Sequence, residues 1–129
     1  MTDDDSSLAE PHPAFSAYFT DPLYEDPSED LAPFGSDEGW DLLAEWAERR
    51  SDLGPRSTVA DVLEDDPFTW LGGGVDELVF VQAAGFVLLR LTGQIDDEGR
   101  RAVLAALALL GSSPVLDRQR LDLEQWASA

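Results

Sequence analysis

Residues 75–110 read VDELVFVQAAGFVLLRLTGQIDDEGRRAVLAALALL and hold the two longest apolar runs of this 129-residue chain. The first run predicts a mostly buried helix over 75–92 that ends at Gly93, because glycine readily adopts the left-handed conformation that follows a helix. The second run predicts a helix over 97–110 with Gly111 as its C-terminal cap. Because few residues join them, we expect the two helices to form an antiparallel hairpin at the centre of the fold.

The start of the second helix is set by an acidic residue, either Asp96 or Asp97, since carboxylates suit the positive end of a helix dipole. Its segment Ala102–Leu110 is apolar on every side, which predicts a place in the middle of the core or in a dimer contact. Small side chains would let the helix backbones approach closely, at Ala105, Ala106 and Ala108.

Further helices are predicted on both sides of this hairpin. Ser36 is a natural N-cap for a helix that ends at Gly54-Pro55, with Trp40, Leu43 and Ala47 as its apolar stripe and Trp46 beside it. Thr58 and Asp61 approximate a capping box for a short second helix. Asp117–Trp126 predicts a last helix, with Leu116, Leu123 and Trp126 facing inward. We therefore expect an all-α, single-domain bundle of about five helices around the central hairpin of 75–92 and 97–110.

Residues 11–35 contain five of the eight prolines and five of the twelve aromatic residues. Prolines disfavour long regular structure, but aromatic side chains are scarce in disordered segments. A short helix opened by Pro13 would place Phe15, Tyr18 and Phe19 on one face. We expect this segment to be ordered and to lie against the body, with residues 1–10 as a disordered acidic tail and 11–129 as a single helical domain.

The charge composition limits the kinds of function. Twenty-seven acidic residues stand against eight basic ones, all arginines, and the net charge is −19. Residues 1–50 contribute −12 of it and residues 51–129 contribute −7. Such a field repels nucleic acids and anionic membranes. It has two interpretations: it keeps the protein soluble and monodisperse, or it attracts a specific cationic partner. The chain has no lysine for a P-loop or a Schiff base and no cysteine for a disulfide or a thiolate site. The acidic start Met1–Asp5 is unlike a signal peptide, so we expect a cytoplasmic protein.

Few residues are candidates for catalysis. The single histidine, His12, lies between two prolines near the acidic tail, and we interpret it as an exposed, ordinary histidine. The carboxylate clusters are Asp65-Asp66, Asp76-Glu77 and Asp96-Asp97-Glu98. Adjacent residues on a helix point in different directions, so these clusters favour capping or solvation over a convergent acid pair. Gly72-Gly73-Gly74 is interpreted as a turn, since acids and not lysine follow it. No cofactor and no metal site is predicted.

One block resembles a known family. It comprises Pro11-His12-Pro13 and the run DLAPFGSDEGWDLL over 30–43. Over about residues 11–50 the chain is similar to the bacterial YfeS-like family, whose members have no established activity. The resemblance therefore implies a fold expectation and no mechanism.

The same block has two physical interpretations. In the first, it is an elaborate helix start that docks residues 11–35, with Phe34 stapling the helix entry. In the second, it is an acidic, aromatic-centred surface that a partner recognises, formed by Pro33, Phe34, Gly35, Ser36, Asp37, Glu38, Trp40 and Asp41. The leading hypothesis is a non-enzymatic protein-interaction module, for example with an immunity- or antitoxin-like role against a basic partner. The alternatives are a carboxylate- or metal-dependent enzyme or small-ligand binder, and a homodimer formed through Ala102–Leu110.

Overall fold

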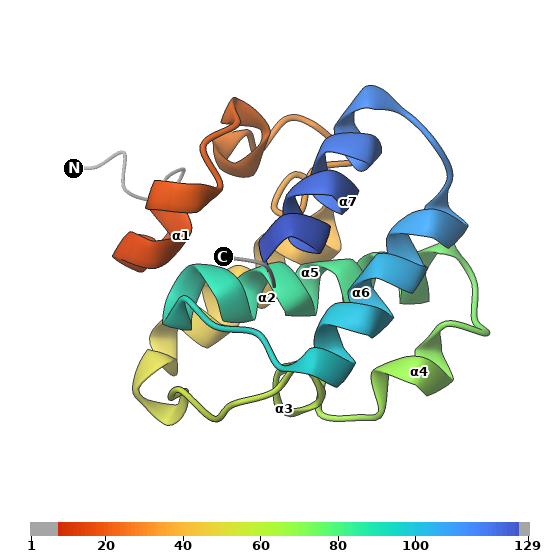
Figure 1. Cartoon of the computed structure of the whole chain (residues 1–129). Helices are drawn as coiled ribbons and strands as arrows, with labels where there is room; N and C mark the ends of the chain where they lie inside the picture. The colour runs from red at the N-terminus through yellow and green to blue at the C-terminus, as the bar shows by residue number, and fades with distance from the viewer. Residues whose placement is uncertain (1–7, 127–129) are drawn as a thin grey trace.

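The computed structural model describes residues 8–126, which form helices and no strand (Figure 1). The predicted all-α class is confirmed. The α-helices are α1 (Pro13–Tyr18), α2 (Asp37–Glu48), α3 (Val59–Leu63), α4 (Pro67–Trp70), α5 (Val75–Thr92), α6 (Asp97–Leu110) and α7 (Pro114–Trp126). Two short 3-10 helices, η2 (Pro22–Glu25) and η3 (Arg50–Asp52), lie on either side of α2 in the sequence.

Helix α5 is the centre of the fold, and its predicted bounds are confirmed. Every residue from Val81 to Leu91 is buried, because α1, α2, α3, α4 and α6 all pack against this helix (Figure 1). Gly93 ends it with a φ of 72°, as predicted from the left-handed preference of glycine. The apolar character of α5 on all sides therefore follows from its being covered on all sides.

Helix α6 differs from the prediction in what it buries. Its inner face carries Ala102, Val103, Ala106 and Leu107, but Ala108 is exposed and Leu109 is 59% exposed. The prediction that Ala102–Leu110 lies in the middle of the core is wrong, because α6 packs against α5 and α7 on one face and leaves its other face exposed. The alternative, a dimer contact, stays a prediction. The close approach of the two helices uses Gly85 of α5, where an added Cβ would meet the Val103 side chain.

Helices α2 and α6 begin in the same way, with a capping residue followed by Asp-Glu-Gly. The Oγ of Ser36 accepts a hydrogen bond from the backbone N–H of Gly39 at 3.0 Å. The carboxylate of Asp96 accepts one from the N–H of Gly99 at 2.9 Å and a second, 2.9 Å long, from the N–H of Val59. Both predicted caps are confirmed, and Asp96 also joins the start of α3 to the start of α6.

The predicted capping box of α3 is confirmed, with hydrogen bonds of 3.1 and 3.0 Å between Thr58 and Asp61. Other helix boundaries differ from the prediction. Helix α2 ends at Glu48, before the predicted Gly54-Pro55, because the chain tightens into η3. Helix α4 was not predicted, and α7 begins at Pro114, three residues before the expected start.

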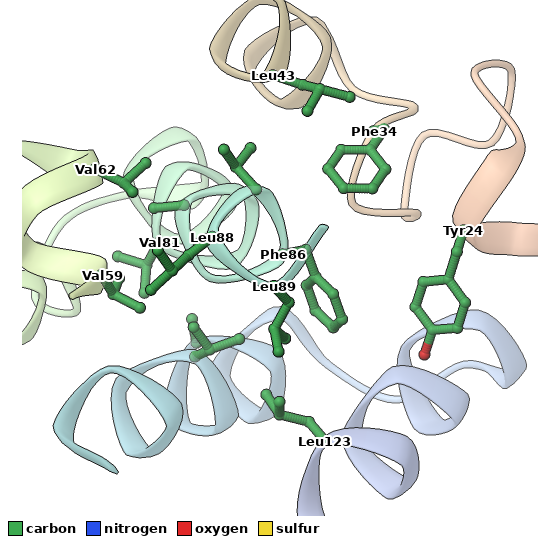
Figure 2. Close-up of a cluster of buried hydrophobic side chains, with 14 of the residues drawn as sticks. Tyr24, Phe34, Leu43, Val59, Val62, Val81, Phe86, Leu88, Leu89 and Leu123 are labelled. Carbon is green, nitrogen blue, oxygen red and sulfur yellow. The ribbon is translucent and has the colours of Figure 1, made fainter. Parts of the chain in front are cut away.

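The Pro- and aromatic-rich segment lies against the body, as predicted. Phe15 and Phe19 stack with their ring centroids 4.8 Å apart, and Tyr24 lies edge-on to Phe19 at 5.1 Å. Tyr24 also faces Phe86 of α5, as Figure 2 shows. Residues 1–7 of the predicted tail lie outside the described residues. Leu8 and Ala9 pack against the core, so the segment that contacts the body begins before residue 11.

Candidate functional site

The predicted partner surface divides into a buried part and an exposed part. Pro33 is buried and Phe34 is 0% exposed, close to Leu43 and Tyr24 in the core (Figure 2). Pro33 and Phe34, which the second interpretation included in a contact surface, are therefore not exposed to a partner. Gly35 lies so close to the Glu29 carbonyl that any side chain would collide with it. This part of the block docks residues 11–35, which is the first of the two interpretations.

The exposed part is formed by the first turns of α2 and centres on Trp40. Asp37 and Asp41 are exposed, whereas Glu38 and Trp40 are half-buried. Asp37, Trp40 and Asp41 are three and four residues apart, so they are neighbours on one face of the helix. The expected apolar stripe of α2 is shifted, since Gly39, Leu43 and Trp46 are its buried residues.

A surface pocket of about 340 Å³ opens beside this face. It is lined by Pro27, Gly35, Ser36, Asp37 and Trp40. Four of these five residues belong to the block from 33 to 41 that the sequence identified, and Pro27 comes from the loop that Gly35 packs against. We call this the Trp40 pocket. Its lining includes one tryptophan and one aspartate, whose side chains are groups suited to a cation.

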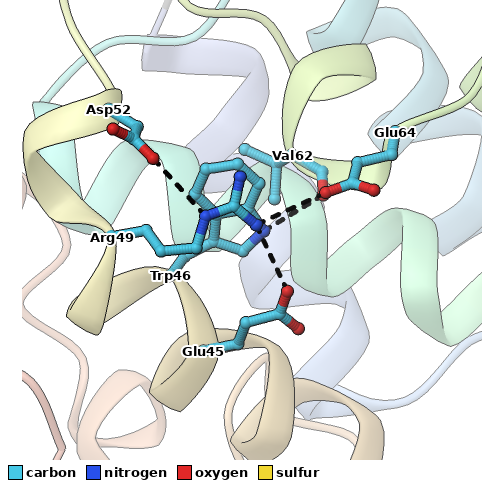
Figure 3. A network of polar contacts seen from close by, with 6 residues as sticks. All are labelled: Glu45, Trp46, Arg49, Asp52, Val62 and Glu64. Atoms are coloured by element: carbon cyan, nitrogen blue, oxygen red, sulfur yellow. Dashed lines mark hydrogen bonds and ion pairs between the residues drawn. The ribbon is translucent and has the colours of Figure 1, made fainter.

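The second tryptophan of α2 shows how such groups hold a cation (Figure 3). The Cζ of Arg49 lies 4.0 Å from the centroid of the Trp46 ring, whose Nε1–H donates to the Val62 carbonyl at 3.1 Å. Three carboxylates surround the guanidinium at 3.4 to 3.5 Å, those of Glu45, Asp52 and Glu64. Partial desolvation lowers the pKa of Arg49, but hydrogen bonds to Glu64 and Asp52 outweigh it and raise the pKa overall.

His12 has a structural role. Its backbone N–H donates to the Arg90 carbonyl at 2.7 Å, and its Nδ1 accepts from the Ala14 N–H at 3.0 Å, which caps α1. The side chain is half-buried beside Gly93, so the expectation of an exposed histidine is wrong. It lines a shallow pocket of about 360 Å³ at the end of α5, together with Leu53, Gly54, Pro55, Leu91, Thr92 and Gln94.

The acidic clusters serve as caps, as interpreted. Glu77 accepts from the Gly74 N–H at 2.9 Å, and Asp66 accepts from the Phe68 N–H at 3.0 Å. Asp65 accepts from the indole N–H of Trp70 at 2.9 Å, and this bond lowers the pKa of its carboxyl. Within residues 8–126 no three histidine, cysteine or acidic side chains form a group that could hold a metal ion.

Another pocket, of about 440 Å³, lies where α3, α4 and α6 begin. It is lined by Thr58, Ala60, Asp66, Pro67, Phe68, Asp96, Glu98 and Gly99. The capping groups in its wall, on Thr58, Asp66 and Asp96, already accept backbone hydrogen bonds. These bonds explain why the polar groups gather there. The pocket therefore marks the place where three helices begin.

A set of buried polar groups beneath the N-terminal segment was not predicted from the sequence. Arg90 is 1% exposed, and its guanidinium binds the Glu25 carboxylate and the carbonyl of Ala9. Gln82 and Gln119 both donate to the Leu31 carbonyl, at 3.0 and 2.8 Å. The available signal was the presence of Gln82 and Arg90 inside an apolar run, because buried polar groups need partners.

Asp122 of α7 holds the two tyrosines of the chain. The hydroxyl of Tyr24 donates to its carboxylate at 2.7 Å, and the hydroxyl of Tyr18 donates to its backbone carbonyl at 2.8 Å. Burial raises the pKa of Tyr24 far above its ordinary value, and the hydrogen bond to Asp122 raises it further. Burial and the Asp122 charge raise the pKa of Tyr18 as well.

The described helices include none that is long and apolar enough to cross a membrane. The similarity of residues 11–50 to the YfeS-like family stays a prediction. No protein-family model, curated protein or solved structure matches this chain.

Proposed function

We propose that this protein is a non-enzymatic binding module for a basic protein in the cytoplasm, and that the partner docks on the acidic N-terminal part of the fold. An immunity- or antitoxin-like role is one form of such a function. The observation that carries the proposal is the separation of charge along the folded chain. Residues 8–48 contain eleven acidic residues and no arginine, whereas residues 49–126 contain thirteen acidic residues and eight arginines.

The ion pairs leave much of this negative charge uncompensated. Asp21, Glu25 and Glu45 each pair with an arginine from the rest of the chain. The other eight acidic residues between 8 and 48 take part in none of the ion pairs within residues 8–126. A concentrated field of one sign accelerates encounter with a partner of the opposite sign and selects against other partners.

The arrangement at Trp40 supports the same conclusion. Tryptophan is enriched at the centres of protein interfaces, and a half-buried indole flanked by carboxylates can bury apolar area while the rim remains charged. Asp37 and Asp41 are one helical turn apart and repel each other, so a cation between them would remove an unfavourable interaction.

Affinity capture with two matched variants tests this function. Asp37→Asn/Glu38→Gln removes two acids from the first turn of α2, and Asp97→Asn/Glu98→Gln removes the equivalent two from α6. Both pairs change the net charge equally and both follow a capping residue, so any effect on helix stability is matched. The protein is used as bait in native lysate at about 20 and about 150 mM salt, and captured proteins are identified by mass spectrometry.

We expect capture of a basic protein that is weaker at the higher salt concentration. With that protein purified, the α2 variant should raise the dissociation constant roughly threefold to tenfold, and the α6 variant should leave it within about twofold. Equal weakening by the two variants would show that only the net charge matters, and would contradict docking on the N-terminal part. Capture of no basic protein at either salt concentration would contradict the proposal as a whole.

A further inference from the structure

Helix α2 carries two tryptophans, Trp40 and Trp46, six residues apart, and each lies in acidic surroundings. The first belongs to the Trp40 pocket. The second belongs to what we call the Arg49 site, in which Trp46 and the carboxylates of Glu45, Asp52 and Glu64 surround Arg49. At Trp46 an arginine from the chain itself covers the ring within a set of carboxylates. At Trp40 the residue three positions further along is Leu43, which is buried in the core and cannot provide a cation. Within residues 8–126 the arginines that lie over aromatic rings are Arg49 and Arg90, and neither lies over Trp40.

We propose that the Trp40 pocket binds the guanidinium group of an arginine of the basic partner, in the way that Trp46 binds Arg49. This inference rests on the proposed function and names the group that the partner contributes. Trp40 and Asp37 both line the pocket, which has a volume of about 340 Å³. Asp41 is exposed one turn beyond Asp37 on the same face of α2 and provides a second carboxylate nearby.

Arginine fits this site better than lysine. A guanidinium is planar and weakly hydrated, so it can stack on an indole while its edge donates to carboxylates. The ammonium of lysine is a compact and strongly hydrated charge, and removing its water is more costly. The Arg49 site shows the stacked arrangement directly, with the guanidinium 4.0 Å from the ring centroid and hydrogen bonds to Glu45, Asp52 and Glu64.

The charge around the pocket also selects a cation. Asp37 and Asp41 are exposed and form no ion pair within residues 8–126. Glu38 follows Asp37, and Asp30 is exposed in the loop before α2. An anionic or neutral group entering the pocket would meet these charges without compensation, whereas a guanidinium would compensate them.

The test uses short peptides as probes and the four tryptophans as reporters. Each indole N–H gives its own signal in a ¹⁵N–¹H correlation spectrum, and Trp40→Phe assigns the signal of interest. The full chain is titrated with N-acetylated tetra-arginine amide and, separately, with tetra-lysine amide, which carries the same charge. We expect the Trp40 signal to shift most and to saturate, with arginine binding about threefold to fivefold more tightly than lysine.

Variants separate stacking on the ring from general attraction. Trp40→Leu keeps every charge and should weaken arginine binding about fivefold. Asp37→Asn/Asp41→Asn keeps the ring and should weaken both peptides, while Asp97→Asn/Glu98→Gln serves as the charge-matched control. The spectra of the variants also show whether each remains folded. If Trp40→Leu disturbs the fold, the double variant Asp37→Asn/Asp41→Asn still tests the inference.

Three results would overturn the inference. Equal affinity for the two peptides would remove the preference for a guanidinium. Unchanged arginine binding in a folded Trp40→Leu variant would remove the role of the ring. Equal shifts of all four indole signals would indicate diffuse attraction. In these cases the proposed function could still hold through the acidic residues alone, as the capture experiment would show. Arginine-specific binding at Trp40 without capture of a basic protein would instead contradict the proposed function.

Discussion

Arg90 and Glu25 bind each other through two parallel hydrogen bonds, from Nη1 to Oε2 at 2.7 Å and from Nη2 to Oε1 at 3.0 Å. The arginine side chain is 2% exposed, whereas the glutamate side chain is 53% exposed. A cation in the last turn of the apolar helix α5 is thus neutralised from the surface by a residue of η2. The Arg90 Nε donates to the Ala9 carbonyl at 2.7 Å, so the same side chain also binds a backbone group of the N-terminal segment.

Glu25→Gln should lower the free energy of unfolding by about 2 kcal/mol. Removing one member of a buried pair leaves the other charge uncompensated, and the partial exposure of Glu25 reduces the loss. Urea unfolding followed by circular dichroism measures the change. Glu124→Gln, an exposed residue outside every ion pair within residues 8–126, is the control and should change stability by less than about 0.5 kcal/mol. A loss no larger than that of the control would show that Arg90 does not depend on this carboxylate.

Truncation of Phe34 should lower mainly the stability of the protein, whereas truncation of Trp40 should lower mainly its binding of arginine peptides. Phe34→Ala empties a fully buried site and should cost about 4 kcal/mol of stability, with no specific effect on arginine-peptide binding. Trp40→Ala removes a half-buried ring and should cost roughly 1 kcal/mol while weakening that binding. Thermal unfolding and peptide titration of the two variants provide the comparison. A stable Phe34→Ala variant would contradict the assignment of Phe34 to the core.

Local signals in the sequence predicted the helical elements well. Ser36 was identified as a cap, and Thr58 and Asp96 were each one of two candidates at a helix start. Each of the three accepts a backbone hydrogen bond as the cap of its helix. Gly93 was identified as the end of α5. These features depend on residues within one helical turn of each other, so a single sequence contains the information. Which side of α6 is covered depends on segments that are distant in the sequence. Leu109, which was expected to be buried, is therefore 59% exposed.

A double-mutant cycle should detect the close packing of Gly85 of α5 against Val103 of α6. Gly85→Ala should destabilise the protein by about 2 kcal/mol, although alanine is the better helix former, because the new Cβ would meet Val103. Combining it with Val103→Ala should recover at least about 1 kcal/mol relative to the sum of the single changes. Urea unfolding of the four proteins gives the coupling. Simple additivity would show that the two helices can separate at this point without loss.

The two tyrosines should resist ionisation in the folded protein. Their raised pKa values mean that the native state holds the phenolic protons more tightly than the unfolded chain does. Their contribution to stability is therefore complete below the pKa of an unfolded tyrosine, about 10, and is lost as the pH rises through the raised native values. Ultraviolet absorbance should detect little tyrosinate at pH ~10 in the native protein, and its appearance should coincide with unfolding.

Tyr24→Phe is the matched variant for this titration. It removes the phenol that donates to Asp122 and leaves the ring, so the alkaline loss of stability should become shallower. The other phenol, that of Tyr18, stays in place and serves as an internal reference. Ionisation of both phenols near pH ~10 without unfolding would contradict the contacts of the two tyrosines with Asp122.

The candidate site could be predicted only in part. Four of the five residues that line the Trp40 pocket lie in the block from 33 to 41 that the sequence identified, because an acidic, aromatic helix start is a local pattern. The sequence could not show that Phe34 turns into the core and Trp40 toward the surface, since this depends on where residues 11–35 lie. The partners of Arg90 lie 65 and 81 positions away, beyond any local pattern.

The anchors of the N-terminal segment determine when it can fold. Tyr18 and Leu31 are held by Asp122 and Gln119, which lie 104 and 88 positions further along the chain. The Tyr18 ring also packs against Trp126, with the ring centroids 5.1 Å apart. A ribosome releases residues 8–35 well before α7, so during synthesis the N-terminal segment must wait for α7 before it can take its final contacts.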